Sequence, residues 1–266
     1  MLYLNQEFAQ EFQQIDPFDW LRSVEGEVFR EVKDRRTVRF SLNNKSYFVK
    51  FHAGVGWREI FKNLFQLRLP ILGAENEWKA IAKLESLGVA TMKAVAYGKR
   101  GWNPASIQSF VVTEELAPTI SLEDYCKNWL QLKPGFQQKK QLIEQVAQIS
   151  KLLHRGGVCH RDYYLCHFLL HGSEDKTEFT GIPELSLIDL HRALIKNKLT
   201  KRWVVKDISG LYYSAMEIGL TRTDLLRFIR IYSGDNLRQS VIKGSRFWTA
   251  VENRGNAMYK KLGSSG

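Results

Sequence analysis

Cysteine is scarce in this chain, and Cys126, Cys159 and Cys166 form neither an even disulfide framework nor a paired CxxC metal motif. We therefore expect reduced thiols and a cytoplasmic protein. No apolar run approaches the ~20 residues that a membrane-spanning helix needs, so any contact with a membrane is expected to be peripheral. The first residues, MLYLNQEFAQEF, lack the basic-then-apolar order of a secretory signal, and we expect the mature chain to begin there.

The composition argues against disorder and for an anionic partner. With 266 residues, 44% of them hydrophobic, the chain can bury one large core or two lobes that share a cleft. A formal net charge of +11 predicts attraction to nucleic acid, an acidic lipid surface, a phosphorylated sugar or an acidic protein. Charge alone does not choose among these four.

The first part of the chain has the patterns of a sheet with one helix. Alternating apolar residues and turn-rich segments predict strands at Glu27–Glu31, Thr37–Leu42, Ser46–His52, Ala94–Tyr97 and Ser109–Thr113. An apolar stripe at helical spacing predicts a helix over Ala74–Leu87, which Gly88 ends. These elements predict an antiparallel, sheet-rich N-lobe over residues 1–116.

The rest of the chain is mainly helical in pattern. Ser121 is expected to cap a helix, and apolar residues at helical spacing predict another over Gln137–His154. The short apolar runs Phe168–Leu170 and Leu185–Leu190 suit a small hairpin, and Asp207 is expected to open a helix over Asp207–Glu217. We therefore predict a helical C-lobe over residues 117–262 and a flexible tail over 263–266. The predicted fold class is α+β, with two lobes.

Two aspartates carry the strongest chemical signal. His160-Arg161-Asp162 is followed after four residues by His167, and Leu187-Ile188-Asp189-Leu190-His191 comes some twenty residues later. This resembles the protein-kinase pair HRDxxxxN and DFG. In phosphoryl transfer one carboxylate orients or deprotonates the attacking hydroxyl, and another holds magnesium against the phosphates of ATP. Either residue alone could be a helix cap, but their order and spacing favour Asp162 as the catalytic group and Asp189 as the metal ligand.

Other positions fit the same arrangement. Lys50 ends an apolar strand, as the kinase lysine that neutralises nucleotide phosphates does. Glu77 is its expected partner and Glu75 the competing candidate; we prefer Glu77 because it shares a helical face with the apolar stripe. Backbone groups of Glu114 and Leu116 are expected to read the adenine edge, although this segment could also be a plain connecting loop.

Two departures from the kinase pattern are visible. No GxGxxG follows the first strand, so Lys and Arg side chains of the turn at residues 32–37 are expected to cover the phosphates instead. His167 stands where kinases have a metal-binding Asn, and imidazole suits transition metals better than magnesium. With His160, His171 and His191 nearby in sequence, structural zinc is an alternative. We expect His160 to buttress the Asp162 loop, and Asp207 to cap its helix or to brace this loop from below.

Longer segments identify a family. The segments are HRDYYLCHFLLH, SLIDLHRA, KRWVVKD, PILGAENEWKAI and VTEELAPTISLEDY. Together, from about Asp16 to Phe228, they resemble the lipopolysaccharide core heptose(I) kinases of Gram-negative bacteria, which have a protein-kinase-like fold. The resemblance implies transfer of the γ-phosphate of ATP, with magnesium, to a hydroxyl of the first heptose. It also implies action at the cytoplasmic face of the inner membrane.

The resemblance suggests uses for the positive charge. Basic residues after Asp189 are expected to meet the anionic glycolipid acceptor. They are Arg192, Lys196, Lys198, Lys201 and Arg202. The amphipathic segment Arg58–Leu69 is expected either to lie in the membrane interface or to pack on the N-lobe. Members of the family associate with acyl carrier protein, an acidic partner, and no nucleic-acid partner is expected.

Three rival functions remain open at this stage. A protein or small-molecule kinase with another acceptor would share Asp162 and Asp189. A pseudokinase scaffold is suggested by the missing glycine loop and by His167, although Lys50, Asp162 and Asp189 argue against it. A basic nucleic-acid-binding module would bind with a steep salt dependence and would not need Asp162.

Overall fold

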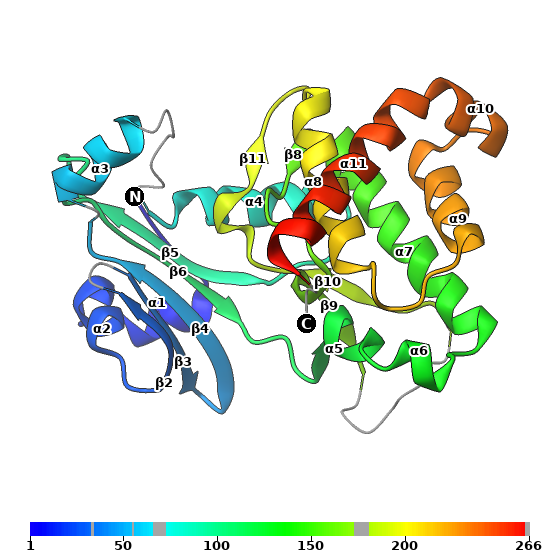
Figure 1. Cartoon of the computed structure of the whole chain (residues 1–266). Coiled ribbons are helices and arrows are strands. Elements are labelled where there is room, and N and C mark those ends of the chain that lie inside the picture. The colour runs from blue at the N-terminus through cyan, green and yellow to red at the C-terminus, as the bar shows by residue number, and fades with distance from the viewer. Residues whose placement is uncertain (33–34, 55, 66–72, 173–180, 264–266) are drawn as a thin grey trace. The chain divides into compact units, whose positions relative to one another are not determined.

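The computed structural model describes the chain except for residues 33–34, 55, 66–72, 173–180 and 264–266 (Figure 1). The chain divides into two compact units, each described here by itself. The first unit comprises Met1–Lys83, Met92–Leu116 and Leu190–Arg192, and the second comprises Leu84–Thr91, Ala117–Asp189 and Ala193–Gly266. The turn at residues 32–37 and the segment Arg58–Leu69 each lie partly outside the described residues.

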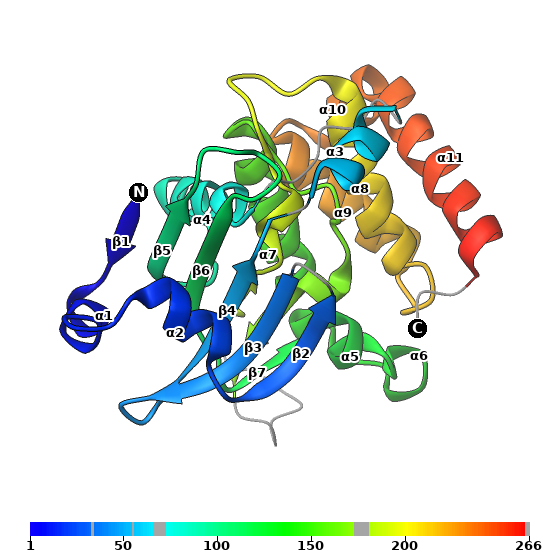
Figure 2. The same ribbon diagram turned by 90° about the vertical axis from the view of Figure 1, so that its left-hand side faces the viewer.

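An antiparallel six-stranded sheet organises the first unit (Figure 2). Its strands are β1 (Leu2–Leu4), β2 (Glu27–Val32), β3 (Arg35–Leu42), β4 (Lys45–His52), β5 (Ala94–Arg100) and β6 (Gln108–Glu114), in the spatial order β1-β5-β6-β4-β3-β2. The five predicted strands are confirmed. The sixth strand, β1, was not predicted. It has only three residues, too few to show an alternating pattern, and it forms by pairing with β5, which is distant in the sequence.

Among the described residues, four helices accompany this sheet in the sequence: α1 (Gln6–Glu11), α2 (Pro17–Ser23), α3 (Gly56–Phe65) and α4 (Glu75–Ser86). The side chains of Asn5 and Asp16 cap α1 and α2 by accepting from backbone N–H groups of Phe8 and Phe18. The predicted helix over Ala74–Leu87 is confirmed as α4. Both caps therefore start helices that the apolar spacing alone had not indicated.

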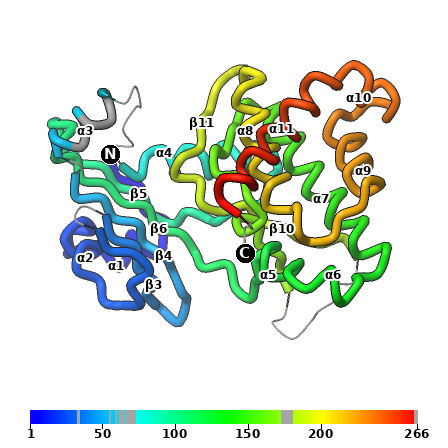
Figure 3. The backbone as a smooth tube through the Cα atoms, viewed as in Figure 1, coloured from blue at the N-terminus to red at the C-terminus, as the bar shows by residue number. Residues whose placement is uncertain are grey.

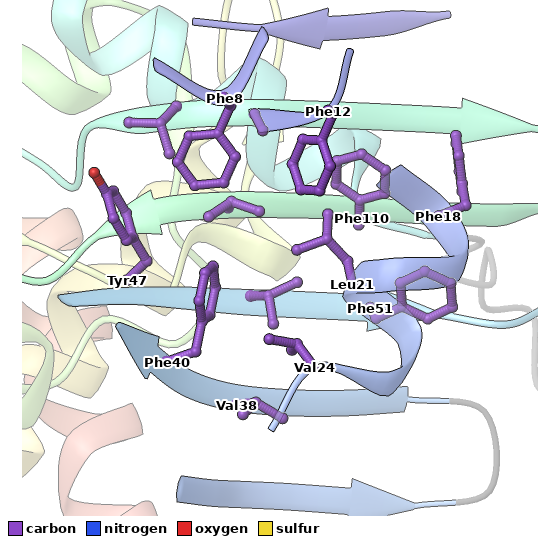
Figure 4. Close-up of a cluster of buried hydrophobic side chains, with 14 residues drawn as sticks. Phe8, Phe12, Phe18, Leu21, Val24, Val38, Phe40, Tyr47, Phe51 and Phe110 are labelled. Atoms are coloured by element: carbon purple, nitrogen blue, oxygen red, sulfur yellow. The ribbon is translucent and has the colours of Figure 1, made fainter. Parts of the chain in front are cut away.

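The core of the first unit lies between α1, α2 and one face of the sheet (Figure 4). Because side chains alternate along a strand, Tyr47, Val49 and Phe51 of β4 point into this core. Phe48 and Lys50, between them, lie on the opposite face and are partly exposed. The alternation thus directs the lysine away from the core.

Where the structure describes it, the second unit is mainly helical, with two small sheets. Its helices are α5 (Leu122–Cys126), α6 (Trp129–Leu132), α7 (Phe136–Arg155), α8 (Lys201–Ser214), α9 (Arg222–Ser233), α10 (Leu237–Lys243) and α11 (Ser245–Leu262). Its strands are β7 (Thr119–Ser121), β9 (Phe168–His171) and β10 (Leu185–Leu187) in one sheet, and β8 (Val158–Cys159) and β11 (Leu194–Ile195) in the other. Helices α8 and α11 pack side by side (Figure 3).

Most predicted elements of this unit are confirmed, and two boundaries were wrong. Ser121 caps α5, and the hairpin forms between β9 and β10. However, α8 begins at Lys201 and carries Asp207 in its interior, so Asp207 does not open a helix. Strand β10 ends at Leu187, and a short 3-10 turn, η2 (Leu190–Arg192), follows. The fold class is α+β, as predicted, and no helix in the described ranges is long and apolar enough to cross a membrane.

Candidate active site

Lys50 and Glu77 form an ion pair within the first unit. Nζ of Lys50 donates to Oε1 of Glu77 at 2.7 Å, and the Glu77 side chain is only 2% exposed. Glu75, the competing candidate, instead binds Lys79 and Lys99. The expected partner is therefore confirmed, and its cause is the helical face that α4 turns inward. The roles of Lys50 and Glu77 toward a nucleotide stay predictions.

The strand end that carries Glu114 and Leu116 is held by several contacts. The backbone N–H of Glu114 donates to the carbonyl of Lys93, and its carboxylate binds the Lys93 ammonium at 2.9 Å. The next residue, Glu115, donates its N–H to the carbonyl of Ser46. These contacts fix the end of β6 against both neighbouring strands. That Glu114 and Leu116 read an adenine edge remains a prediction.

In the second unit, Asp207 organises the loop before Asp162. It is 1% exposed and accepts from the backbone N–H groups of His160 at 2.6 Å and Arg161 at 2.8 Å. Burial raises the pKa of Asp207, but hydrogen bonds from His154 and from the Arg161 backbone outweigh it and lower the pKa below its usual value. The expectation that Asp207 braces this loop is confirmed, and the alternative that it caps a helix is wrong.

The hydrogen bonds to Asp207 stabilise an unfavourable backbone conformation at Arg161. Arg161 has φ +75°, in the left-handed region that L-residues with long side chains seldom adopt. Its N–H is bound by Asp207, and its guanidinium lies 5.4 Å from the ring centroid of Trp203. Both contacts come from α8, so this helix sets the conformation of the residue next to Asp162.

Asp162, His167 and Asp189 come together in this unit. Nδ1 of His167 lies 2.6 Å from the carbonyl oxygen of Asp162 and donates to it, while Nε2 lies 3.6 Å from Oδ2 of Asp189. His160 is fully buried, stacks on His167, and its Nε2 donates to the carbonyl of Ile188 at 2.8 Å. The expected buttressing role of His160 is thereby confirmed.

The hairpin presents Asp189 at its end. The N–H of Leu187 donates to the carbonyl of Ala90, and that of Ile188 donates to the carbonyl of His167. Asp189 then turns into the left-handed region with φ +60°, which ends the strand before the predicted Leu190. Aspartate tolerates this conformation better than most residues.

The remaining predicted metal and acceptor residues have other surroundings. Nε2 of His171 pairs with Oγ of Ser186 across the β9–β10 hairpin. In the part of the chain that the structure describes, no group of three or more His, Cys, Asp or Glu side chains is arranged to hold a metal ion. Lys201 and Arg202 are exposed in the first turn of α8, whereas Arg192 belongs to the first unit.

Sequence reasoning missed a buried polar network beneath the loop. His154, at the end of α7, bonds to Asp207 through Nε2 and to the hydroxyl of Tyr232 through Nδ1. Beside it, Ser150 bonds to the hydroxyl of Tyr163, which is 1% exposed. The available signal was a serine and a histidine on the apolar face of a long helix, since buried polar groups need partners.

The second unit also contains an apolar pocket of about 280 Å³. Helices α5, α7, α8, α9 and α11 line it, mostly with Leu, Ile, Val and aromatic side chains. Asp162 and Asp189 are not among the lining residues. The pocket is therefore a feature separate from the aspartate pair.

Known proteins resemble the chain along nearly its full length. Residues 19–232 match the lipopolysaccharide kinase (Kdo/WaaP) family. The chain is 47% identical over 235 residues to a lipopolysaccharide core heptose(I) kinase WaaP of Escherichia coli, covering 87% of each chain. It is 45% identical over 260 residues to the WaaP of Pseudomonas aeruginosa, covering 98% of this chain and 96% of that one. A solved structure of WaaP in complex with acyl carrier protein matches with a TM-score of 0.85 and 42% identity, over 97% of this chain and 99% of that one.

Proposed function

Because the chain belongs to the lipopolysaccharide kinase (Kdo/WaaP) family and is an ATP-dependent sugar kinase, we propose that its acceptor is a hydroxyl of heptose I in the lipopolysaccharide inner core. The proposal is carried by one observation in particular. Asp162, His167 and Asp189 converge in a chain that is 45–47% identical to named heptose(I) kinases.

Asp162 is proposed to orient or deprotonate the heptose hydroxyl. Its loop is braced by Asp207 on one side, and its carbonyl oxygen accepts from His167 on the other. A positioned carboxylate of this kind typically contributes about 10²- to 10⁴-fold to the rate. Phosphoryl transfer depends on such positioning more than on covalent chemistry by the protein.

Asp189 is proposed to hold magnesium, because a carboxylate oxygen is the kind of ligand that this ion prefers. Because Nδ1 of His167 donates to the carbonyl of Asp162, the ring is oriented with Nε2 toward the Asp189 carboxylate. Magnesium in kinases usually takes one or two carboxylates together with phosphates and water, so a larger protein cluster is not needed. When bound, magnesium would neutralise phosphate charge. His167, as a nitrogen donor, is the weaker of the two proposed ligands.

Lys50 is proposed to neutralise the nucleotide phosphates. The buried carboxylate of Glu77 holds its ammonium at 2.7 Å and so limits the orientations of a long side chain. Glu114 and Leu116 are proposed to contact the adenine edge through their backbone groups. The contacts that fix the end of β6 support this role.

We propose that basic residues contact the acceptor. We also propose that the protein binds peripherally to the cytoplasmic face of the inner membrane. The net charge of +11 and the proposed acceptor residues Arg192, Lys201 and Arg202 suit an anionic glycolipid. Trp57, Phe61 and Phe65 are exposed at four-residue spacing on α3, and such residues suit a membrane interface. Extraction of the protein from membranes by salt, without detergent, would support this placement, and a wholly unbound protein would refute it.

Acyl carrier protein is proposed as a partner, because the similar WaaP structure is a complex with it. We propose that the apolar pocket of the second unit takes the acyl chain. We expect capture of the acylated carrier to exceed capture of the unloaded carrier in a pull-down. Ala215→Phe, which narrows the pocket, should reduce this preference several-fold. Equal capture of both carrier forms by the wild type would contradict the proposal.

The acceptor is tested by labelling dephosphorylated core lipopolysaccharide with radioactive ATP. We expect the wild type to transfer one phosphate to heptose I, and Asp162→Ala to lose about a hundredfold or more of this activity. Asp235→Ala, at an exposed aspartate of the same unit, is the matched control and should label normally.

The failures of this experiment are informative in different ways. Labelling of a protein or a small molecule, but not of the core, would favour a kinase with another acceptor. Absence of any ATP turnover in the wild type would favour a pseudokinase. Undiminished labelling by Asp162→Ala would refute the role given to Asp162.

A further inference from the structure

An irregularity in β2 brings an aromatic side chain onto the sheet face that carries Lys50. Val28 pairs with Val38 and Arg30 pairs with Thr37, so Phe29 is an extra residue between two registered pairs. Such a bulge locally re-aims a side chain and is common beside active sites. The Phe29 ring packs against Phe48 with centroids 5.3 Å apart and planes at 67°.

A third side chain clamps this aromatic pair. The guanidinium of Arg39 lies 5.9 Å from the centroid of Phe29, and Arg39 is registered directly opposite Phe48. It also binds Glu27 at 2.6 Å and Glu115 at 3.2 Å, which ties β2 to the segment after β6. A guanidinium held from two sides restrains the ring that it contacts. The pair is therefore a built feature of this face.

The position of the pair is the second observation. Phe48 and Lys50 are two residues apart on β4 and share a face, about 7 Å apart along the strand. Across the sheet Phe48 is registered with Thr113, the residue before Glu114. Phe48 thus lies between the proposed phosphate-binding ammonium and the proposed base-reading segment, and Phe29 packs against it from β2. Phe29 nevertheless remains 55% exposed, although burial of such a ring is favourable.

We propose that Phe48, with Phe29 against it and Arg39 as clamp, is the platform on which the base of ATP stacks. A planar purine is the occupant that fits, because it covers an aromatic face while its phosphates extend along β4 toward Lys50. The two rings meet at a steep angle, and an edge contact of this kind covers less of a ring face than parallel stacking would. In a chain without GxGxxG, base stacking supplies affinity that backbone contacts to phosphate supply elsewhere.

The test rests on nucleotide binding and not on the acceptor. Phe48→Ala is expected to weaken ATP binding by calorimetry about 10- to 100-fold, because each aromatic stack on a base has about that effect. Inorganic tripolyphosphate, which has no base, should bind the variant as it binds the wild type. Val28→Ala, which shortens an apolar residue of β2 on the opposite face of the sheet, is the matched control and should leave both affinities unchanged.

Several outcomes would overturn the platform. Unchanged ATP affinity in Phe48→Ala would do so, as would equal losses for ATP and tripolyphosphate, since these indicate general damage to the lobe. If Phe48→Ala does not fold, Phe48→Leu keeps an apolar side chain nearer in size but without an aromatic ring, and stacking predicts selective loss of ATP affinity in that variant too. The platform builds on the proposed nucleotide site, but it is independent of the heptose acceptor, so failure to label lipopolysaccharide would leave these binding results interpretable.

Discussion

Asp207→Ala is expected to remove almost all phosphoryl transfer and to destabilise the second unit by about 3 kcal/mol or more. The carboxylate accepts from the N–H groups of His160 and Arg161 and from the His154 ring. Its removal leaves these donors buried without acceptors and releases Arg161 from its left-handed conformation. The loop that carries Asp162 then loses its fixed geometry. Denaturant unfolding and ATP-dependent labelling measure the two effects.

Two further variants separate geometry from general damage. Asp207→Asn keeps the size of the side chain, but its amide donor must face a backbone N–H, so we expect an intermediate loss of stability and activity. Asp235→Ala is exposed and should change neither quantity. If Asp207→Ala had the unfolding free energy and the labelling activity of the wild type, the brace would not be needed.

Asp207 also marks the limit of what the sequence could predict. An aspartate before an apolar stretch normally signals a helix start, so the sequence predicts a helix from Asp207 onward. The helix in fact begins after Thr200, whose side chain makes no cap hydrogen bond for α8. Burial beneath the loop that carries Asp162 is a tertiary effect, so it overrode the local preference. The partner role was predictable, but the place of Asp207 in the helix was not.

The preference for Glu77 over Glu75 was correct because it depends on a local pattern and not on a tertiary contact. Helical periodicity is local, and it directs Glu77 inward on the same face as buried Ile81 and Leu84. The bulge at Phe29 was out of reach, because Val28 and Phe29 are both apolar and no pattern shows which of them is extra. Sequence analysis therefore identified residues that follow a period, and missed those that depend on strand pairing.

Lys50→Met is expected to lower phosphoryl transfer about a hundredfold or more and to destabilise the first unit by about 3 kcal/mol. The loss of rate follows if the ammonium neutralises phosphate charge. The loss of stability follows because the carboxyl group of Glu77, 2% exposed, loses the cation that it pairs with, and its Oε2 already has no hydrogen-bond partner in the described part of the chain. Denaturant unfolding and labelling again measure the two quantities.

The double variant Lys50→Met with Glu77→Gln separates stability from function. Removing the buried charge should restore most of the unfolding free energy, because a neutral amide is less costly to bury than an unpaired carboxylate. It should restore no activity, since the ammonium is still absent. Lys79→Met, which breaks an exposed pair with Glu75, is the control and should change stability by less than about 0.5 kcal/mol. If the double variant regained transfer, Lys50 would serve only to compensate the charge of Glu77, and the phosphate-binding role would have to be abandoned.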